Sequence, residues 1–284
     1  MKKGICWGCI PTQSSNASGA DSGDWSQVLA NTLLVAREAG YDGVELTVSE
    51  PGQGPLTLET TQDDAARIKG IAAEAGVALP SLMCGSAVRT TPVLHPDASV
   101  RAQAVDNLGR TLERAKWLGA TAVLLHPGQL KPEMRYDQAW EWTCDALKAT
   151  VPHAERHGVA LAIENVWNKF ILSPTEMKQM IDEVGNPLIG TYFDVGNCIL
   201  YGYPEQWVAI LGSRIKKVHV KDFKRAVGTG KGFCQLLDGD ADYPAVMAEL
   251  RRAGYDDYLT SEVSVGNMPE GQGIHTTAER IDQI

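Results

Sequence analysis

The sequence predicts an α/β protein that folds as a single (β/α)8 TIM barrel over residues 1–284. Short β-rich runs alternate with longer helical stretches along the whole chain, and eight such runs can be counted. Several runs are continuously apolar, as are strands buried on both faces of a parallel sheet. An open doubly wound sheet is the alternative, but no Gly-x-Gly-x-x-Gly turn follows the first run. No linker or shift in composition indicates a second domain.

The first half of the chain contains three βα units and the start of a fourth. Its strand candidates are 4–10, 43–48 and 77–83, and its helix candidates are 25–39, 62–75 and 99–118. The longest of these stretches places Leu108, Leu112 and Ala115 at helical spacing, which predicts one face packed on the sheet.

The second half repeats the pattern more clearly. Its strand candidates are 122–125, 159–163, 189–193, 215–220 and 258–262, and its helix candidates are 136–157, 174–184, 204–211, 245–253 and 276–284. Pro174 is expected at the first turn of its helix, where the missing N–H costs nothing.

Composition excludes several classes of protein. The formal net charge is −9 and mean hydropathy is −0.17, so a nucleic-acid partner is not expected. No apolar run approaches the length of about 18 residues that a membrane span needs. Lacking the features of a signal peptide, the chain is expected in the cytoplasm with its six cysteines reduced.

Four consecutive predicted strands end in a side chain that can bind a metal ion. Glu164, Asp194, His219 and Glu262 come at or next to the carboxyl ends of the last four strands. The catalytic residues of an α/β barrel lie at these ends. Three carboxylates and one imidazole suit Mn²⁺, Mg²⁺ or Co²⁺ better than a thiolate zinc site would, so we expect one divalent ion there.

The residues around these four positions resemble the metal-binding motifs of the sugar phosphate isomerase/epimerase family. This family of xylose-isomerase-like TIM barrels includes ketose 3-epimerases and xylulose-phosphate 3-epimerases. The motifs are Ile163-Glu164-Asn165, Phe193-Asp194-Val195-Gly196-Asn197, Val218-His219-Val220-Lys221-Asp222 and Thr260-Ser261-Glu262-Val263. The resemblance covers nearly the whole chain and is stronger for the family than for any substrate.

The resemblance implies a site and a reaction. Glu164, Asp194, His219 and Glu262 would bind the metal, Mn²⁺ before Mg²⁺ or Co²⁺, with no organic cofactor. The two glutamates would also transfer protons on a ketose or ketose phosphate, through an enediolate that the metal stabilises. Epimerisation at C3 is favoured over aldose–ketose isomerisation, although the same residues could serve either. A homo-oligomer is also implied.

Further substrate contacts are expected at neighbouring strand ends. The candidates are Trp7, Glu45, His126, Trp167, Asn197, Lys221 and Arg225. Arg225 matches a family arginine that holds substrate oxygens. Asn197 stands where free-ketose epimerases have a histidine, and phosphosugar relatives often have this asparagine. Glu45 could bind the substrate or His126, or serve only as a structural tie.

A basic segment that holds Lys221, Lys224, Arg225 and Lys231 follows the seventh strand. Barrels often bind phosphate near the loops after strands seven and eight, so this segment could hold a substrate phosphate. It could equally be a solvated loop on an acidic protein.

Three other functions are alternatives to an isomerase or epimerase. A lyase or dehydratase, such as a dehydroshikimate dehydratase or a carbon–glycoside-cleaving enzyme, could use the same metal site. An abasic-site endonuclease would need three zinc ions and many histidines, and six histidines with a charge of −9 argue against it. A non-catalytic sugar binder would not need all four metal ligands.

Overall fold

The computed structural model describes residues 1–11, 25–270 and 272–284, and it contains a closed barrel of eight parallel strands. The barrel order is β1, β2, β3, β4, β5, β6, β7 and β10, which pairs again with β1. These strands are Lys2–Cys6, Gly43–Val48, Ser81–Cys84, Ala122–Leu125, Ala160–Glu164, Ile189–Asp194, Ile215–Val220 and Tyr258–Ser261. The prediction of an eight-stranded TIM barrel is therefore confirmed.

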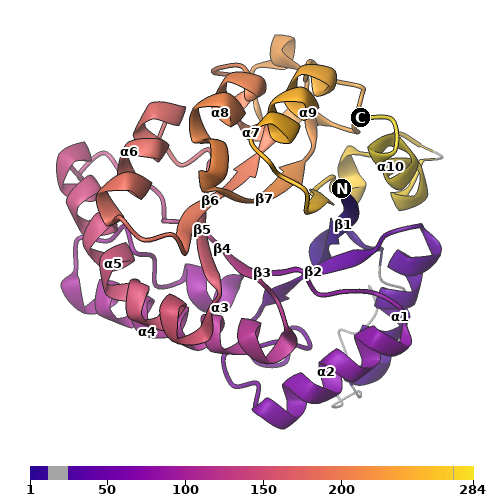
Figure 1. Cartoon of the computed structure of the whole chain (residues 1–284), viewed down its shortest axis with the longest axis horizontal. Helices are drawn as coiled ribbons and strands as arrows, with labels where there is room; N and C mark the ends of the chain where they lie inside the picture. The colour runs from indigo at the N-terminus through magenta and orange to yellow at the C-terminus, as the bar shows by residue number, and fades with distance from the viewer. Residues whose placement is uncertain (12–24, 271) are drawn as a thin grey trace.

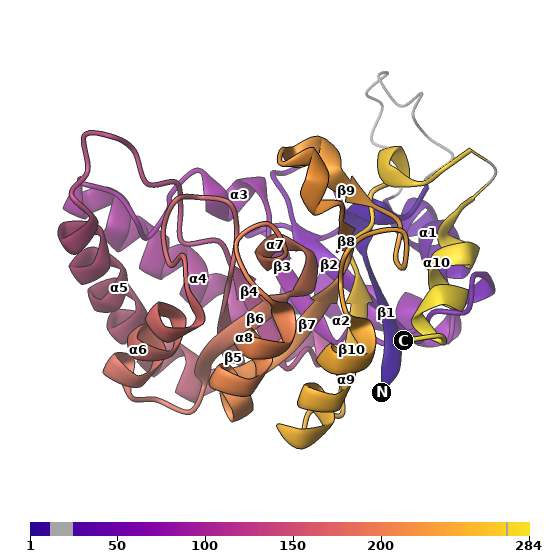
Figure 2. The same ribbon diagram turned by 90° about the horizontal axis from the view of Figure 1, so that it is seen from above.

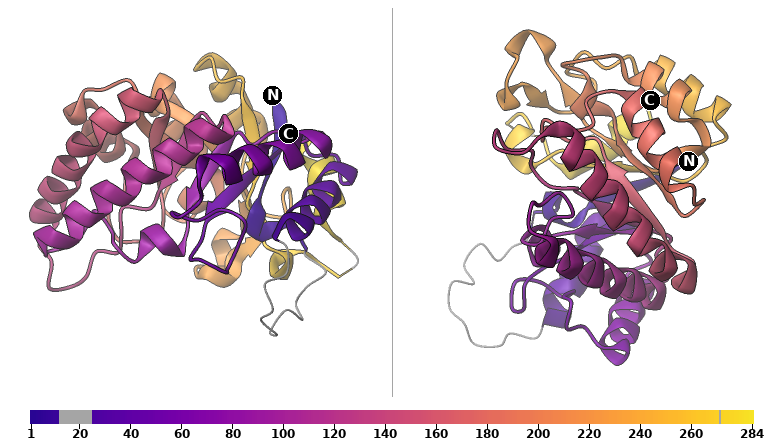
Figure 3. Two further views of the ribbon diagram at one scale, coloured as in Figure 1. Left: turned by 90° about the horizontal axis from the view of Figure 1, so that it is seen from below. Right: turned by 90° about the vertical axis from the view of Figure 1, so that its left-hand side faces the viewer.

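In the described part of the chain, eight helices of eight or more residues surround the barrel. Figure 1 shows helices around the outside of the strands. The eight helices are α1 (Trp25–Glu38), α2 (Gln62–Glu74), α4 (Ala98–Leu118), α5 (Tyr136–His157), α6 (Pro174–Val184), α8 (Pro204–Leu211), α9 (Tyr243–Arg252) and α10 (Ile274–Ile281). Among the described residues, no helix is both long enough and apolar enough to cross a membrane. The two ends of the chain lie close together near the amino end of β1 (Figures 2 and 3).

Local sequence signals set the ends of these helices. Thr61 and Ser173 each form a capping box with the acidic residue three positions later, and Pro174 occupies the first turn of α6. The helices α4 and α5 end at Gly119 and Gly158, whose positive φ angles of 82° and 63° favour glycine. These signals explain why the predicted helix positions largely agree with the observed ones.

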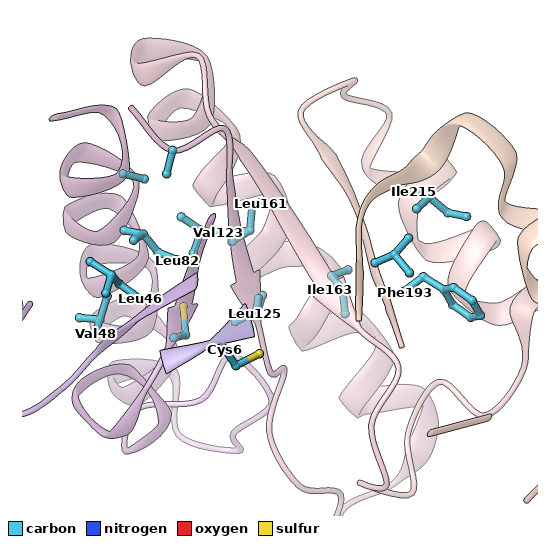
Figure 4. Packing of buried hydrophobic residues seen from close by; sticks show 14 of the residues in the cluster. Cys6, Leu46, Val48, Leu82, Val123, Leu125, Leu161, Ile163, Phe193 and Ile215 are labelled. Atoms are coloured by element: carbon cyan, nitrogen blue, oxygen red, sulfur yellow. The ribbon is translucent and has the colours of Figure 1, made fainter. Parts of the chain in front are cut away.

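Alternation along the strands separates the barrel interior from the helix-covered exterior. Leu46, Leu82, Val123, Leu161 and Ile163 belong to the large apolar core between strands and helices (Figure 4). A separate small cluster of Leu124, Ala162 and Tyr192, with Met83 packed against it, fills the interior. Side chains two positions apart on a strand point to the same side of the sheet. A residue at the carboxyl end of a strand, two positions after an inward-pointing one, therefore points into the barrel mouth.

Two predicted strands differ from the observed strands by more than one residue at an end. The run 4–10 is not one strand, because β1 ends at Cys6 and a 3₁₀ turn follows over Trp7–Cys9. The run 77–83 pairs regularly only from Ser81, since Pro80 has no N–H to donate to a neighbouring strand. Two short helices that the sequence did not indicate, α3 (Ser86–Arg89) and α7 (Val195–Cys198), follow β3 and β6.

A small hairpin lies beyond the seventh barrel strand. It pairs β8 (Asp222–Phe223) with β9 (Phe233–Cys234) in antiparallel fashion, and Figure 2 shows it on the side of the barrel that also carries α7. The buried carboxylate of Asp222 accepts backbone N–H groups from Phe223, Leu237, Gly239 and Ala241 at 2.8–3.1 Å. A Cβ on Gly239 would come within 2.2 Å of the Asp222 Oδ1 atom, so this loop closes tightly on the carboxylate.

We expect Asp222→Asn to lower the free energy of unfolding by about 2 kcal/mol, because an amide offers one acceptor oxygen where the carboxylate offers two. Urea denaturation followed by circular dichroism measures this change. Asp106→Asn, on the exposed face of α4, is the matched control and should change stability little. Equal stability of the two variants would contradict the anchoring role.

Candidate active site

The four predicted metal ligands meet at the carboxyl end of the barrel. One ligand atom each from Glu164, Asp194, His219 and Glu262 lies within 4.8 Å of the others. Asp194 and His219 are fully buried, Glu164 is 2% exposed, and the side chain of Glu262 is 23% exposed. The cluster is therefore mostly buried, and Glu262 is its most exposed member.

The two nitrogens of His219 face different groups. Nδ1 lies 3.3 Å from Glu164 Oε1 and 3.8 Å from both Asp194 Oδ2 and Glu262 Oε2. Nε2 lies 3.0 Å from Glu45 Oε1, and Ser81 Oγ donates to the other oxygen of Glu45 at 2.6 Å. An ionised Glu45 only accepts hydrogen bonds, so it holds the proton on Nε2 and leaves Nδ1 facing the carboxylates.

Glu45 contacts a different histidine from the one expected. We expected a possible bond to His126, but Glu45 is fully buried against His219, whereas His126 Nε2 lies 2.9 Å from Glu164 Oε2. In the barrel order β1 and β10 lie between β2 and β7, and the side chains of Glu45 and His219 meet inside the barrel. Burial opposes the charge of Glu45, yet His219 and hydrogen bonds lower the pKa of Glu45 below its ordinary value.

Three residues around His219 were not predicted as site residues. Cys6 Sγ lies 3.4 Å from His219 Nε2, and the rings of Tyr192 and His219 have centroids 4.3 Å apart. Tyr192 OH is 3.2 Å from Ser81 Oγ, so it extends the chain that leads to Glu45. The signal for Tyr192 was its position two residues before Asp194, which puts both side chains on one face of β6.

Lys221 lies within the acidic cluster. Its Nζ is 3.1 Å from Asp194 Oδ2 and forms an ion pair with Glu262 Oε2. Its side chain is 13% exposed, and the surrounding carboxylates raise the pKa of Lys221 although burial opposes its charge. Lys221 therefore offsets part of the repulsion between the clustered carboxylates.

Electrostatics favour a cation at the centre of the cluster. Burial raises the pKa of Asp194 to about 7, against the attraction of Lys221, and the negative charges of Glu262 and Glu164 raise it further. Burial opposes the charge of His219, but Glu45 and Glu262 raise its pKa well above the ordinary value. Positive charge beside Nδ1 is thus favoured, whether a proton or a metal ion supplies it.

The donor set fits a divalent metal ion. Asp194 Oδ2 is a buried oxygen that faces the cluster, where its ion-pair partners are Lys221 Nζ at 3.1 Å and His219 Nδ1 at 3.8 Å. The other Asp194 oxygen accepts the backbone N–H of Asn197 at 2.7 Å, while Asn165 bonds both backbone groups of Asp194. Asp194 is therefore held rigidly with one oxygen directed into the cluster, as a metal ligand requires.

His126 and Asn197 contact the ligand residues. Burial opposes the charge of Glu164, but His126 and His219 lower the pKa of Glu164 below its ordinary range. Asn197 is buried, and its carbonyl accepts the indole N–H of Trp167 at 2.7 Å.

The aromatic and basic candidates lie farther out. Trp167 packs on Tyr201, Phe223 and Phe233, and Trp7 lies half-buried in the turn after β1. Arg225 is exposed after β8, with Nε donating to Ile199 O at 3.1 Å and its guanidinium 5.5 Å from the centre of the Tyr203 ring. Their contacts with a substrate stay predictions.

The family follows from the sequence match. Residues 33–284 match the family model described as xylose isomerase-like TIM barrel. The chain belongs to this family. Within it, L-ribulose-5-phosphate 3-epimerase UlaE of Salmonella paratyphi C (strain RKS4594) is 29% identical over 224 residues, which is 78% of each chain.

Solved structures of epimerases share the fold of this family member. A structure of L-ribulose 3-epimerase superposes with a TM-score of 0.74 at 20% identity and covers 99% of this chain and 92% of its own. D-allulose 3-epimerase from Methylomonas sp., in complex with D-allulose, gives a TM-score of 0.72 at 18% identity over 98% of this chain and 93% of its own.

We expect Glu45→Gln to weaken Mn²⁺ binding by about 10–100-fold, since the variant no longer holds His219 with an ionised carboxylate. Isothermal titration calorimetry with Mn²⁺ measures the affinity. Glu59→Gln, exposed before α2, is the matched control. Unchanged affinity in Glu45→Gln would show that His219 needs no support from Glu45.

Metal affinity should rise with pH. The pKa of Asp194 is about 7 and the pKa of His219 is raised well above its ordinary value, so below pH 7 bound protons compete with the metal. Each pH unit below 7 should then lower the affinity by at least about tenfold. Mn²⁺ titrations between pH 5.5 and 8 measure the slope. A flat profile below pH 7 would contradict the raised pKa.

Proposed function

We propose that this protein is a divalent-metal-dependent epimerase that inverts C3 of a ketose or ketose phosphate by removing and returning a proton. One observation carries the proposal. Glu164 and Glu262 come from β5 and from the end of β10, and they converge on one buried cluster with Asp194 and His219. The names of the relatives, which are 3-epimerases, support an isomerase-class enzyme.

The two glutamates are held by different basic groups. His126 Nε2 lies beside Glu164 Oε2 at 2.9 Å, and Lys221 forms an ion pair with Glu262 Oε2. Each glutamate therefore has a basic partner that fixes its orientation. Because the two carboxylates come from different strands, one can face each side of a bound sugar. Inversion requires this arrangement, since the proton leaves one face and returns on the other.

Glu164, Asp194, His219 Nδ1 and Glu262 would hold the metal ion, and Mn²⁺ suits this set. When bound, such an ion supplies Lewis-acid stabilisation of the negative charge that builds on the carbonyl oxygen, worth several kcal/mol. Trp167 offers an apolar wall at the mouth, and the exposed side of Glu262 gives returned protons access to solvent. Arg225 and Asn197 are proposed to bind sugar oxygens.

The deprotonation roles predict a specific isotope result. Glu164→Gln and Glu262→Gln should each lower epimerisation by at least about 10³-fold, since an amide cannot accept the proton. Proton NMR in D₂O, with Mn²⁺ and a panel of free and phosphorylated ketoses, measures deuterium at C3.

Glu176→Gln, which changes a half-buried glutamate at the start of α6, is the control and should keep exchange near that of the unmodified protein. Substantial inversion of C3 in either active-site variant would refute that glutamate's role, since the remaining glutamate can exchange a proton on its own face but cannot deliver one to the other face. Exchange at C1 in place of C3 would instead indicate aldose–ketose isomerisation.

A further inference from the structure

A cavity lies beside the acidic cluster, and the proposed function assigns no role to it. It measures about 410 Å³ and lies among the loops that follow β3, β4 and β5. His126 and Trp167 line it. Because His126 also touches Glu164, the cavity borders the cluster that would hold the reacting carbons.

The walls of this cavity carry basic groups and no described acidic residue. Arg89, His95 and Lys131 line it together with His126. Among the residues that the structure describes, no carboxylate forms an ion pair with Arg89 or Lys131. His95 Nδ1 accepts the backbone N–H of Asp97 at 3.1 Å, so a neutral His95 carries its proton on Nε2 and donates from there. The cavity is therefore a cationic space next to an acidic one.

The basic segment after β7 is less suited to an anion than its sequence indicates. Lys221 is committed to Asp194 and Glu262. Arg225 donates from Nε to Ile199 O and stacks on Tyr203, and its backbone N–H is bound by Asp240. Lys224 and Lys231 are exposed and do not line the cavity, whereas Arg89 and Lys131, which are also exposed, do line it.

We propose that the cavity between the loops after β3, β4 and β5 binds the terminal phosphate of a ketose phosphate, with Arg89 and Lys131 as its principal charged partners. The proposal rests on the function proposed above and names the substrate class. Arginine suits this role because its planar guanidinium can donate two parallel hydrogen bonds to a phosphate. The carbons near the carbonyl would lie at the acidic cluster and the phosphate at the basic end.

The test compares each variant on a ketose 5-phosphate and on the matching free ketose. Arg89→Gln and Lys131→Gln should each lower kcat/KM for the phosphate by about tenfold or more, the usual effect of losing a charge-assisted hydrogen bond, and leave the free ketose unchanged. Lys69→Gln, exposed on α2, is the charge-matched control. Equal losses on both substrates, or no loss on the phosphate, would overturn the assignment.

The double change Lys224→Gln with Lys231→Gln tests the alternative that the phosphate binds at the basic segment after β7. Loss of the preference for phosphate in this variant, with retention in Arg89→Gln, would place the phosphate after β7 and overturn the proposal. Retention of the preference for phosphate in the double variant, with its loss in Arg89→Gln, supports the proposal.

Binding of inorganic phosphate, followed by ³¹P NMR on the full-length protein, separates the two proposals. If no ketose is epimerised but Arg89→Gln weakens phosphate binding at least tenfold, the proposed reaction fails and the phosphate site stands. If epimerisation occurs and Arg89→Gln binds inorganic phosphate as the unmodified protein does, the phosphate site fails and the reaction stands.

Discussion

The site depends on the burial of several negative charges at one end of a closed barrel. Glu164 and Asp194 are almost entirely removed from water, and Glu262 reaches the same cluster. Like charges this close in a medium of low dielectric constant repel strongly and are stable only beside compensating cations. His219 and Lys221 supply part of that positive charge, and a divalent ion would supply the rest. The raised pKa of Asp194 is the sign that compensation by side chains alone is incomplete.

The inward faces of the strands also determine how the cluster is oriented. Glu45 and Ser81 hold one side of the His219 ring, so the other nitrogen faces the carboxylates. Asn165 fixes the backbone of Asp194. Because Glu45 and Ser81 lie on paired strands and Asn165 directly follows β5, the atoms proposed to bind the metal are positioned in advance. The acidic cluster and the adjacent basic cavity then provide two chemically distinct ends for one elongated anionic substrate.

The sequence was sufficient for the fold and for the meeting of the four predicted ligands at one end of the barrel, because both follow from short-range patterns. Apolar runs and capping residues locate strands and helices, and a ligand directly after a strand must lie at the barrel mouth. Contacts across the barrel could not be predicted in this way. That Glu45 meets His219 rather than His126, and that Lys221 lies between Asp194 and Glu262, depends on which inward rows face each other. The cationic cavity likewise draws Arg89, His95 and Lys131 from loops whose conformations no local signal specifies.

The most direct test of this account is the position of the metal ion. Crystals grown with Mn²⁺ and measured near the manganese absorption edge give an anomalous difference map that locates it. We predict one peak, coordinated by Glu164, Asp194, His219 Nδ1 and Glu262. The structure also offers another set of donors, Cys6 with His219 and Glu262, in which Cys6 Sγ lies 3.4 Å from His219 Nε2, the nitrogen that faces Glu45. A peak there, or no peak at all, would contradict the account.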